Sequence, residues 1–267
     1  MDSARNTDAQ TASAHNAVIL DQFTRQAQPF AASTTIRNQA VLDRILEMAG
    51  PQPEDTVLDV ACGPGLLACA VAQRVRHVTG CDLTPAMLEQ AKIVQQENGL
   101  TNVKWEIGDA TALPYGDGEF SLVTTRFTFH HFLDPLAALK EMRRVCCPGG
   151  RVLVTDSSPA AAKADAFNAL EKLRDPSHVR ALPVEELRAL FQHAGLGDPR
   201  WETCRLEGDL DDLLRHSFPN QGDDARVRQR FEDSLQDDAL DLATRAGHGT
   251  ILYGFPVAIL AATLPGN

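Results

Sequence analysis

Short apolar segments alternate with helical patterns between residues 56 and 157, and this alternation restricts the possible folds more than any other feature of the sequence. Most of the intervening segments have helical spacing, and one of them opens with Pro85 and ends at Gly99. Strands joined by helices form parallel sheets with helices on both faces. The sequence therefore predicts an α/β fold with a doubly wound sheet, whose first five strands are TVLDVA, HVTGCDL, NVKWEIGD, EFSLVTTRF and GGRVLVTDSS.

The segments that flank this alternation predict the remaining organisation of the chain. Residues 1–15 are polar and small and predict a flexible terminus, whereas residues 16–50 predict two helices that form a lid. The core would span residues 51–207. Residues 208–248 are acidic with a helical pattern and predict an insertion that covers the substrate. Residues 249–267 predict one or two antiparallel strands that complete a sheet of about seven strands.

Charge and cysteine content argue against several classes of protein. Lys and Arg total 25 against 36 Asp and Glu, and the formal net charge of −11 disfavours a nonspecific nucleic-acid binder. The six cysteines lack zinc-site spacing and are too few for a disulfide scaffold, so we expect no metal site. No leader peptide and no membrane-spanning run is visible. We expect a cytoplasmic protein that is a monomer or a homodimer.

Ligand-binding residue types gather where the first three expected strands end. Asp59 closes the first strand and is followed by a turn that contains Gly63 and Gly65, Asp82 closes the second strand, and Asp109 follows the third. The carboxyl ends of parallel strands meet at one edge of a sheet, so these residues should lie together. An acid at the position of Asp82 suits ribose hydroxyls, and one at Asp109 could accept from the adenine amine. The pattern predicts an adenosine site.

The glycine turn leaves two kinds of adenosine ligand open. Gly63, Gly65 and Ala68 satisfy a relaxed dinucleotide fingerprint, which would indicate a nicotinamide-dependent oxidoreductase. Asp59 argues against that interpretation, because an acid at the mouth of the turn would repel a pyrophosphate. The same acid suits the ammonium or sulfonium of S-adenosylmethionine, which carries no phosphate. The charges favour S-adenosylmethionine.

The sequence resembles the class I S-adenosylmethionine-dependent methyltransferases, most closely their small-molecule branch that includes the ubiquinone/menaquinone biosynthesis enzymes. The resemblance rests on VLDVACGPG, VTGCDLTPAMLEQAK, GDATALPYGDGEFSLV and CCPGGRVLVTD, and it covers about Thr56 to Ser157. It implies a Rossmann-like fold, S-adenosylmethionine as cofactor and S-adenosylhomocysteine as product. The motifs are specific for the superfamily and say little about the acceptor.

The same resemblance implies which residues contact the cofactor. These fall into three groups: around the methionine portion Asp59, Ala61, Gly63 and Gly65; around the ribose and adenine Asp82, Leu83, Met87, Asp109 and Ala110; and beside the methyl donor Arg126 and Phe127. The residues alone support the acids and the glycines. For Met87 they are equally consistent with a place in the core.

Catalysis of methyl transfer requires alignment of the acceptor and exclusion of water more than it requires a protein nucleophile. An acceptor that loses a proton would gain from a nearby base, and His130 and His131 follow the fourth strand at the ligand edge. Either histidine is a candidate base, and both could instead serve packing. Asp134 is expected to cap the helix that Pro135 opens.

The acceptor is expected to be a small molecule with an oxygen, nitrogen or carbon nucleophile. Several aromatic residues could converge above the cofactor, which would favour an aromatic or apolar acceptor. Two alternatives remain at this point: the nicotinamide-dependent oxidoreductase, and a noncatalytic domain that retains the cofactor fold.

Overall fold

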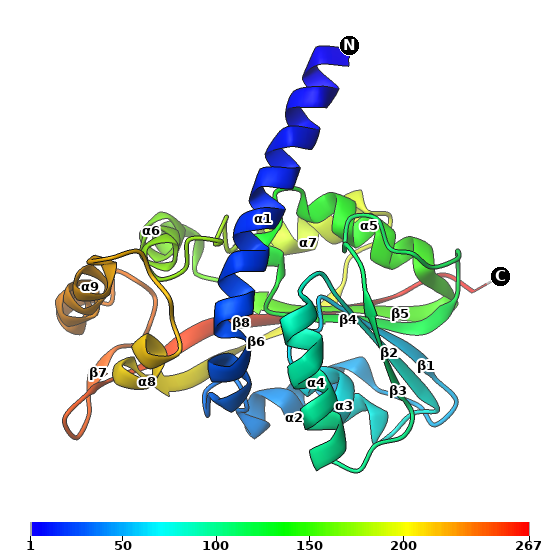
Figure 1. The fold of residues 1–267 in the computed structure, drawn as a ribbon, viewed down its shortest axis with the longest axis horizontal. Coiled ribbons are helices and arrows are strands. Elements are labelled where there is room, and N and C mark those ends of the chain that lie inside the picture. Colours follow the sequence, from blue (N-terminus) through cyan, green and yellow to red (C-terminus); the bar gives the residue numbers. More distant parts are fainter. Residues whose placement is uncertain (1, 267) are drawn as a thin grey trace.

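A computed structural model describes residues 2–266, with side chains from residue 10 onward. Met1 and Asn267, the outermost residues of the two predicted end segments, lie outside the described part. An eight-stranded sheet forms the centre of the molecule, in the order β3-β2-β1-β4-β5-β8-β6 with β7 paired to β8 (Figure 1). The strands are β1 (Thr56–Val60), β2 (His77–Asp82), β3 (Val103–Ile107), β4 (Phe120–Arg126), β5 (Cys146–Ser157), β6 (Arg200–Asp209), β7 (Arg245–Ala246) and β8 (Ile251–Thr263).

Strand direction follows the prediction of a mostly parallel sheet. β1 pairs in parallel with β2 and β4, and the pairs β2/β3 and β4/β5 are also parallel. β8 lies between β5 and β6 and is antiparallel to both. The chain reverses its direction of strand addition at β1, because β2 and β3 extend the sheet to one side and β4 and β5 to the other. This reversal point is where open α/β sheets bind ligands.

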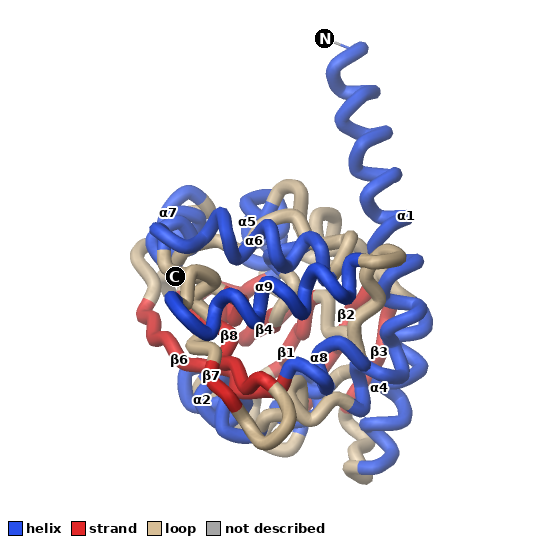
Figure 2. Tube along the Cα trace, turned by 90° about the vertical axis from the view of Figure 1, so that its left-hand side faces the viewer, coloured by secondary structure: helices blue, strands red, loops and turns tan. Residues whose placement is uncertain are grey.

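The helices cover both faces of the sheet, with α5 and α7 on one face and α2 and α3 on the other (Figure 1). One end of α1 extends beyond the rest of the molecule (Figure 2). Two short 3-10 helices, η1 (Phe129–His131) and η2 (Ala161–Lys163), complete the set. The α-helices are α1 (Asp2–Ala32), α2 (Gln39–Ala49), α3 (Leu66–Ala72), α4 (Pro85–Glu97), α5 (Pro135–Val145), α6 (Ala164–Arg174), α7 (Val184–His193), α8 (Leu210–Arg215) and α9 (Asp223–Asp237).

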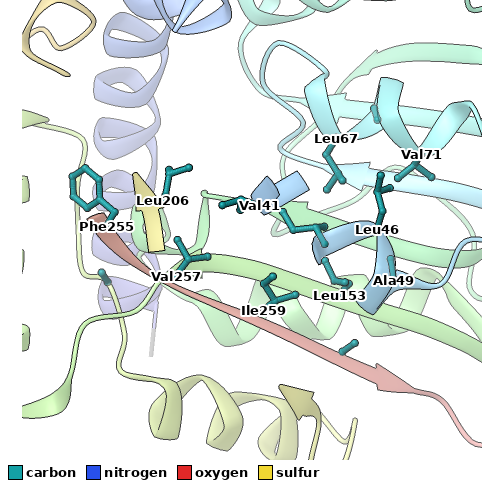
Figure 3. Close-up of a cluster of buried hydrophobic side chains, with 14 of the residues drawn as sticks. Val41, Leu46, Ala49, Leu67, Val71, Leu153, Leu206, Phe255, Val257 and Ile259 are labelled. Carbon is teal, nitrogen blue, oxygen red and sulfur yellow. The ribbon is translucent and has the colours of Figure 1, made fainter. Parts of the chain in front are cut away.

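The buried side chains form two clusters, one on each face. The first packs α2 and α3 onto the sheet and continues under β8, where Leu206, Phe255 and Val257 lie on the same side as Val41 (Figure 3). The second packs α5 and α7 onto the opposite face. Successive residues of a strand point to opposite faces, and accordingly Val57 joins the first cluster while Leu58 joins the second.

Local signals explain several helix boundaries. Asp134 caps α5 by accepting a hydrogen bond from the Ala137 N–H at 2.9 Å, which confirms the prediction. Pro85 opens α4. Gly50 ends α2 in a left-handed conformation with φ of 54°.

The structure differs from the sequence predictions at three places. α1 begins at Asp2, whereas the first of the two expected helices was placed from residue 16. The sheet has a short eighth strand, β7, inside the predicted insertion. β5 begins at Cys146, earlier than the predicted strand GGRVLVTDSS, because β-bridging to Phe120 starts at this residue. Among the described helices, none combines the length and apolar character of a transmembrane helix.

Candidate active site

A cavity of about 360 Å³ lies at the carboxyl ends of β1, β2 and β4. Side chains and backbone from the strand ends form its floor, and residues from α1 form part of its wall. It is lined by all the predicted cofactor residues except Gly65: Asp59, Ala61, Gly63, Asp82, Leu83, Met87, Asp109, Ala110, Arg126 and Phe127. His131 also borders this cavity, whereas His130 does not. The parallel arrangement of the strands thus places residues that are distant in the sequence around one cavity, as expected from the strand ends.

The glycine turn is tied to the end of β2 through Asp82. Its two carboxylate oxygens accept hydrogen bonds from the backbone N–H of Gly63 and of Thr84, each at 2.8 Å. Burial raises the pKa of Asp82, although both N–H groups act in the opposite direction. Gly63 has a φ of 52°, and a Cβ there would meet no atom within 4 Å. Asp82 therefore fixes the turn while each oxygen retains capacity for a further donor.

Gly65 has a structural role that the sequence did not reveal. It precedes α3 with φ of 74°, and a Cβ at this position would lie 2.4 Å from Cη2 of Trp105. The glycine therefore allows Trp105 on β3 to pack against the start of α3. Its predicted contact with a cofactor finds no support in the cavity lining.

Asp59 and Arg126 place opposite charges in the same buried wall. Asp59 Oδ1 accepts a hydrogen bond from Thr124 Oγ1 at 2.9 Å, and Arg126 donates to the Ile36 carbonyl at 2.5 Å. Asp59 Oδ2 and Arg126 Nε have no hydrogen-bond partner within residues 2–266. Burial raises the pKa of Asp59 to about 7, against the effects of Thr124 and Arg126. Burial also lowers the pKa of Arg126 to about 10. Both side chains have capacity for a polar ligand.

α1 contributes residues that sequence reasoning missed. Asn16 donates a hydrogen bond to Asp109 Oδ2 at 3.3 Å, and His15 Nε2 donates to the His131 carbonyl at 2.7 Å. Asp109 Oδ1 accepts from the backbone and hydroxyl of Thr111 at 2.8 and 2.7 Å. Ala12, Ile19 and Ile36 also line the cavity, as do Phe23 and Phe30, which are among the aromatic residues expected to converge above the cofactor. No motif marks these residues, because their partners lie far along the chain.

A second cavity of about 80 Å³ adjoins the first, and several residues belong to both walls. The shared residues are Phe23, Phe30, Ile36, Phe127 and His131. The second cavity extends toward α6, α8 and β8, where Tyr253 and Phe255 line it. Phe127 has a positive φ of 55° and stands between the two spaces, with the Arg126 guanidinium 4.9 Å from its ring centre. The two cavities are therefore neighbours that share part of their walls.

The two adjacent histidines face different surroundings. His130 lines only the second cavity, and its Nδ1 and backbone N–H both contact the Asp156 carboxylate. His131 Nδ1 donates to the Ser177 carbonyl at 3.1 Å. Burial and the neighbouring His130 lower the pKa of His131 to about 4. Burial likewise acts to lower the pKa of His130, but the charge and hydrogen bond of Asp156 outweigh it and raise this pKa.

Metal-ligand residue types do not converge in the described structure. Within residues 2–266, no group of three or more His, Cys, Asp or Glu side chains is arranged to hold a metal ion. The ring centres of His130, His131 and His178 are 4.2 to 6.4 Å apart, but their nitrogens bond to separate protein groups. The described site therefore consists of acids, glycines, histidines and an apolar wall.

Comparison with known proteins assigns this arrangement to a family. The model of the methyltransferase domain family matches residues 58–154, which run from β1 to β5. A relative named an uncharacterized methyltransferase, YcgJ from Bacillus subtilis, is 35% identical over 171 residues, which are 63% of this chain and 68% of the relative. The chain belongs to the methyltransferase family. Like the resembling class I enzymes, it is an S-adenosylmethionine-dependent methyltransferase.

Two further similarities support the assignment of the chain to the methyltransferase family. The crystal structure of the Bacillus subtilis YcgJ protein superposes with a TM-score of 0.76 at 26% identity, covering 86% of this chain and 100% of that chain. The demethylmenaquinone methyltransferase of Thermus thermophilus is 39% identical over 132 residues, which are 49% of this chain and 57% of that relative. This second match spans less than two thirds of the relative, so it supports the shared domain and leaves the acceptor open.

Proposed function

We propose that the methyltransferase binds S-adenosylmethionine in the larger cavity and methylates a small molecule held in the adjoining one. The unpaired carboxylate oxygen of Asp59 in the cavity wall carries this proposal. An acceptor atom buried without a partner costs roughly 1–3 kcal/mol, and a cationic ligand would satisfy it. A pyrophosphate would instead bring negative charge against Asp59. The observation therefore favours an ammonium-bearing, phosphate-free nucleoside over a dinucleotide.

The residues of the cavity fit the parts of that cofactor. Asp59, Ala61 and Gly63 would hold the methionine portion, with the charge of Asp59 toward the ammonium. The remaining lone pairs of Asp82 would accept from the ribose hydroxyls. The adenine would contact Leu83, Met87, Asp109 and Ala110. The hydrogen bond between Asn16 and Asp109 would close the adenine end of the cavity. When bound, S-adenosylmethionine would supply an electrophilic methyl group on a good leaving group.

The chain's own task is to align the acceptor in line with the methyl group and to exclude water. Phe127, which lines both cavities, and Arg126, which lines the larger one, would keep the acceptor at the required position. The N-terminal helices of residues 16–50 would act as a lid, since α1 already borders both cavities. Residues 208–248 would act as a cover, since Leu213, His216 and Ser217 line the second cavity.

The walls favour a planar or apolar acceptor whose nucleophile is oxygen, nitrogen or carbon. Four aromatic residues line the second cavity with Phe127: Phe23, Phe30, Tyr253 and Phe255. Relatives named demethylmenaquinone methyltransferases are consistent with a ring-shaped acceptor. The six cysteines are free thiols, which is typical of a reducing compartment and supports a cytoplasmic location.

Ligand binding and turnover test the proposal separately. S-Adenosylmethionine or S-adenosylhomocysteine at about 100 times its Kd should stabilise the fold by roughly 2.7 kcal/mol and raise the melting temperature, whereas NAD(H) should not. Transfer of a labelled methyl group to a panel of phenols, amines and enolisable carbon acids would then identify the acceptor class. Stabilisation by NAD(H) alone would replace the proposal with an oxidoreductase. Donor binding without transfer to any panel member would indicate a noncatalytic cofactor-binding domain.

A further inference from the structure

The second cavity contains a polar group that the proposed function does not yet use. His130 lines this cavity and is 7% exposed, and its ring is turned so that Nδ1 contacts Asp156 Oδ1. The other oxygen of Asp156 accepts the His130 backbone N–H at 2.8 Å, and Oδ1 also accepts the Ser157 N–H at 2.6 Å. One carboxylate therefore fixes both the backbone and the ring of His130.

This arrangement determines which ring nitrogen carries the lone pair. A carboxylate at Nδ1 keeps the proton on that nitrogen, so the neutral imidazole has its lone pair on Nε2. Nε2 of His130 has no hydrogen-bond partner in the described part of the chain. His131 differs, since it borders both cavities and its Nδ1 is bound to a neutral carbonyl. Of the two adjacent histidines on η1, His130 is therefore oriented by a carboxylate, whereas His131 lines the cavity walls.

We propose that His130 is the general base of the methyl transfer, that Asp156 is its positioning residue, and that the acceptor is a neutral planar compound with an acidic hydroxyl. This inference rests on the proposed function, because it assigns the second cavity to the acceptor. In the step, a bond forms between the acceptor oxygen and the methyl carbon while the carbon–sulfur bond breaks with its electron pair on sulfur. The hydroxyl proton moves to His130 Nε2 and later to solvent.

The charges around His130 support a neutral acceptor. Arg174 in the cavity wall pairs with Glu171 at 2.7 Å, so an anionic acceptor would have to compete for this arginine. Asp175 in the same wall accepts hydrogen bonds from the Ser177 hydroxyl and N–H. His178, whose ring centre is 5.4 Å from that of His130, has its pKa lowered to about 2 by burial and the neighbouring histidines. His216 also lines this wall and lies 3.4 Å from Asp212.

The pKa of His130 is raised because the effect of Asp156 outweighs burial. A base with a raised pKa is neutral only at the alkaline side of its titration, so turnover should rise with pH through this pKa. Replacing Asp156 by Asn removes the charge that raises the pKa and should move the rise to lower pH. A purely structural role for Asp156 predicts no such movement.

Nuclear magnetic resonance of ¹⁵N-labelled histidines tests the inference without cofactor or turnover. The His130 signals are assigned by their absence in His130→Gln, and phenol serves as the acceptor probe. We expect a neutral form protonated at Nδ1, a pKa above the ordinary 6.5, and a phenol-induced shift of the Nε2 signal. The exposed His193 at the end of α7 should show no shift with phenol. Protonation at Nε2, or no response of His130 to phenol, would overturn the inference.

Turnover with phenolic acceptors between about pH 5 and about pH 9 gives the second measurement. His130→Gln should lower kcat by roughly 100-fold or more while changing the cofactor Kd by less than about twofold. His193→Gln should match the wild type. Asp156→Asn should lower kcat and shift the acid limb to lower pH, and Asp156→Glu should restore part of both. If Asp156→Asn does not fold, the wild-type resonance experiment decides.

The outcomes separate this inference from the proposed function. Cofactor binding together with unchanged kcat in His130→Gln would refute the base and leave the methyltransferase site intact. Cofactor binding with transfer only to amines or carbon acids would refute the hydroxyl acceptor. Failure of cofactor binding in the wild-type protein would remove the proposed function and this inference with it.

Discussion

Asp59 is buried at the end of β1 with one unpaired oxygen, and the proposed cofactor binding at this residue should depend on pH. Its pKa, raised to about 7 by burial, means that the carboxyl is protonated below this pH. A protonated carboxyl attracts an ammonium weakly. We therefore expect the affinity for S-adenosylmethionine, measured by calorimetry, to be nearly constant above about pH 8. It should fall by up to about tenfold per pH unit below about pH 7.

Asp59→Asn should weaken binding by roughly 1–3 kcal/mol and make its pH dependence shallower. Some dependence should remain, because the pKa of Asp82 is raised as well. Asp43→Asn on the exposed face of α2 is the matched control and should behave as the wild type. A variant at Asp59 that keeps both the affinity and the full steepness would contradict the role of this carboxylate.

The two glycines of the turn should respond differently to substitution by alanine. Gly65→Ala combines a left-handed backbone with a collision against Trp105, so urea unfolding should show a loss of roughly 2–4 kcal/mol. Gly63→Ala meets open space and should cost only the roughly 1–2 kcal/mol of the left-handed conformation. Equal losses in the two variants would show that Trp105 adjusts without cost.

Sequence reasoning could place the strand-end acids together but could not choose between the two histidines, for a physical reason. The acids Asp59, Asp82 and Asp109 could be placed together because parallel strands align their carboxyl ends. No periodic rule says which of two neighbouring histidines on a 3-10 turn faces which cavity. That orientation depends on Asp156, which lies 26 positions further along the chain.

At the level of elements, α1 lines both cavities. Its Asn16 reaches Asp109 beside the larger cavity, while Gln26 lies 3.4 Å from Asp175 in the wall of the smaller one. The sequence predicted helices here from apolar spacing and placed the start near residue 16. It could not predict the polar contacts, because Asn16 belongs to no motif and lies 93 positions from Asp109, its partner.

Ligand binding should therefore reduce the mobility of α1. We expect slower hydrogen exchange for residues 12–30 when S-adenosylhomocysteine is added, because the helix forms wall residues of the binding cavity. Helix α9 lines neither cavity and should exchange at an unchanged rate. Unchanged exchange in α1 on a protein that demonstrably binds the ligand would argue against a lid.

For the molecule as a whole, buried histidines make stability depend on pH. Burial and the neighbouring histidines hold the pKa of His178 at about 2, so the unfolded chain binds more protons than the folded one between about pH 6.5 and this value. Stability is therefore lost as the pH falls below about 6.5. His131 acts in the same direction down to about 4, and Asp59 acts in the opposite one.

A single variant isolates one of these contributions. His178→Gln keeps a donor for Asn168, which accepts from His178 Nε2 at 2.7 Å. Between about pH 7 and about pH 5, urea unfolding should show that the wild type loses about 2 kcal/mol more stability than this variant. Parallel losses in both proteins would mean that His178 is protonated in the folded state.

The position of β8 has a consequence for the order of events during synthesis. β6 has no edge to join until β8 lies against β5, since β8 separates the two strands. The first five strands, which include the three at whose ends the larger cavity lies, are complete by Ser157, whereas β8 begins only at Ile251. During synthesis on the ribosome, we expect the part of the chain up to Ser157 to collapse early. The residues between Ser157 and Ile251 would emerge before β8, with which β6 pairs, and would be exposed to chaperones until β8 is made.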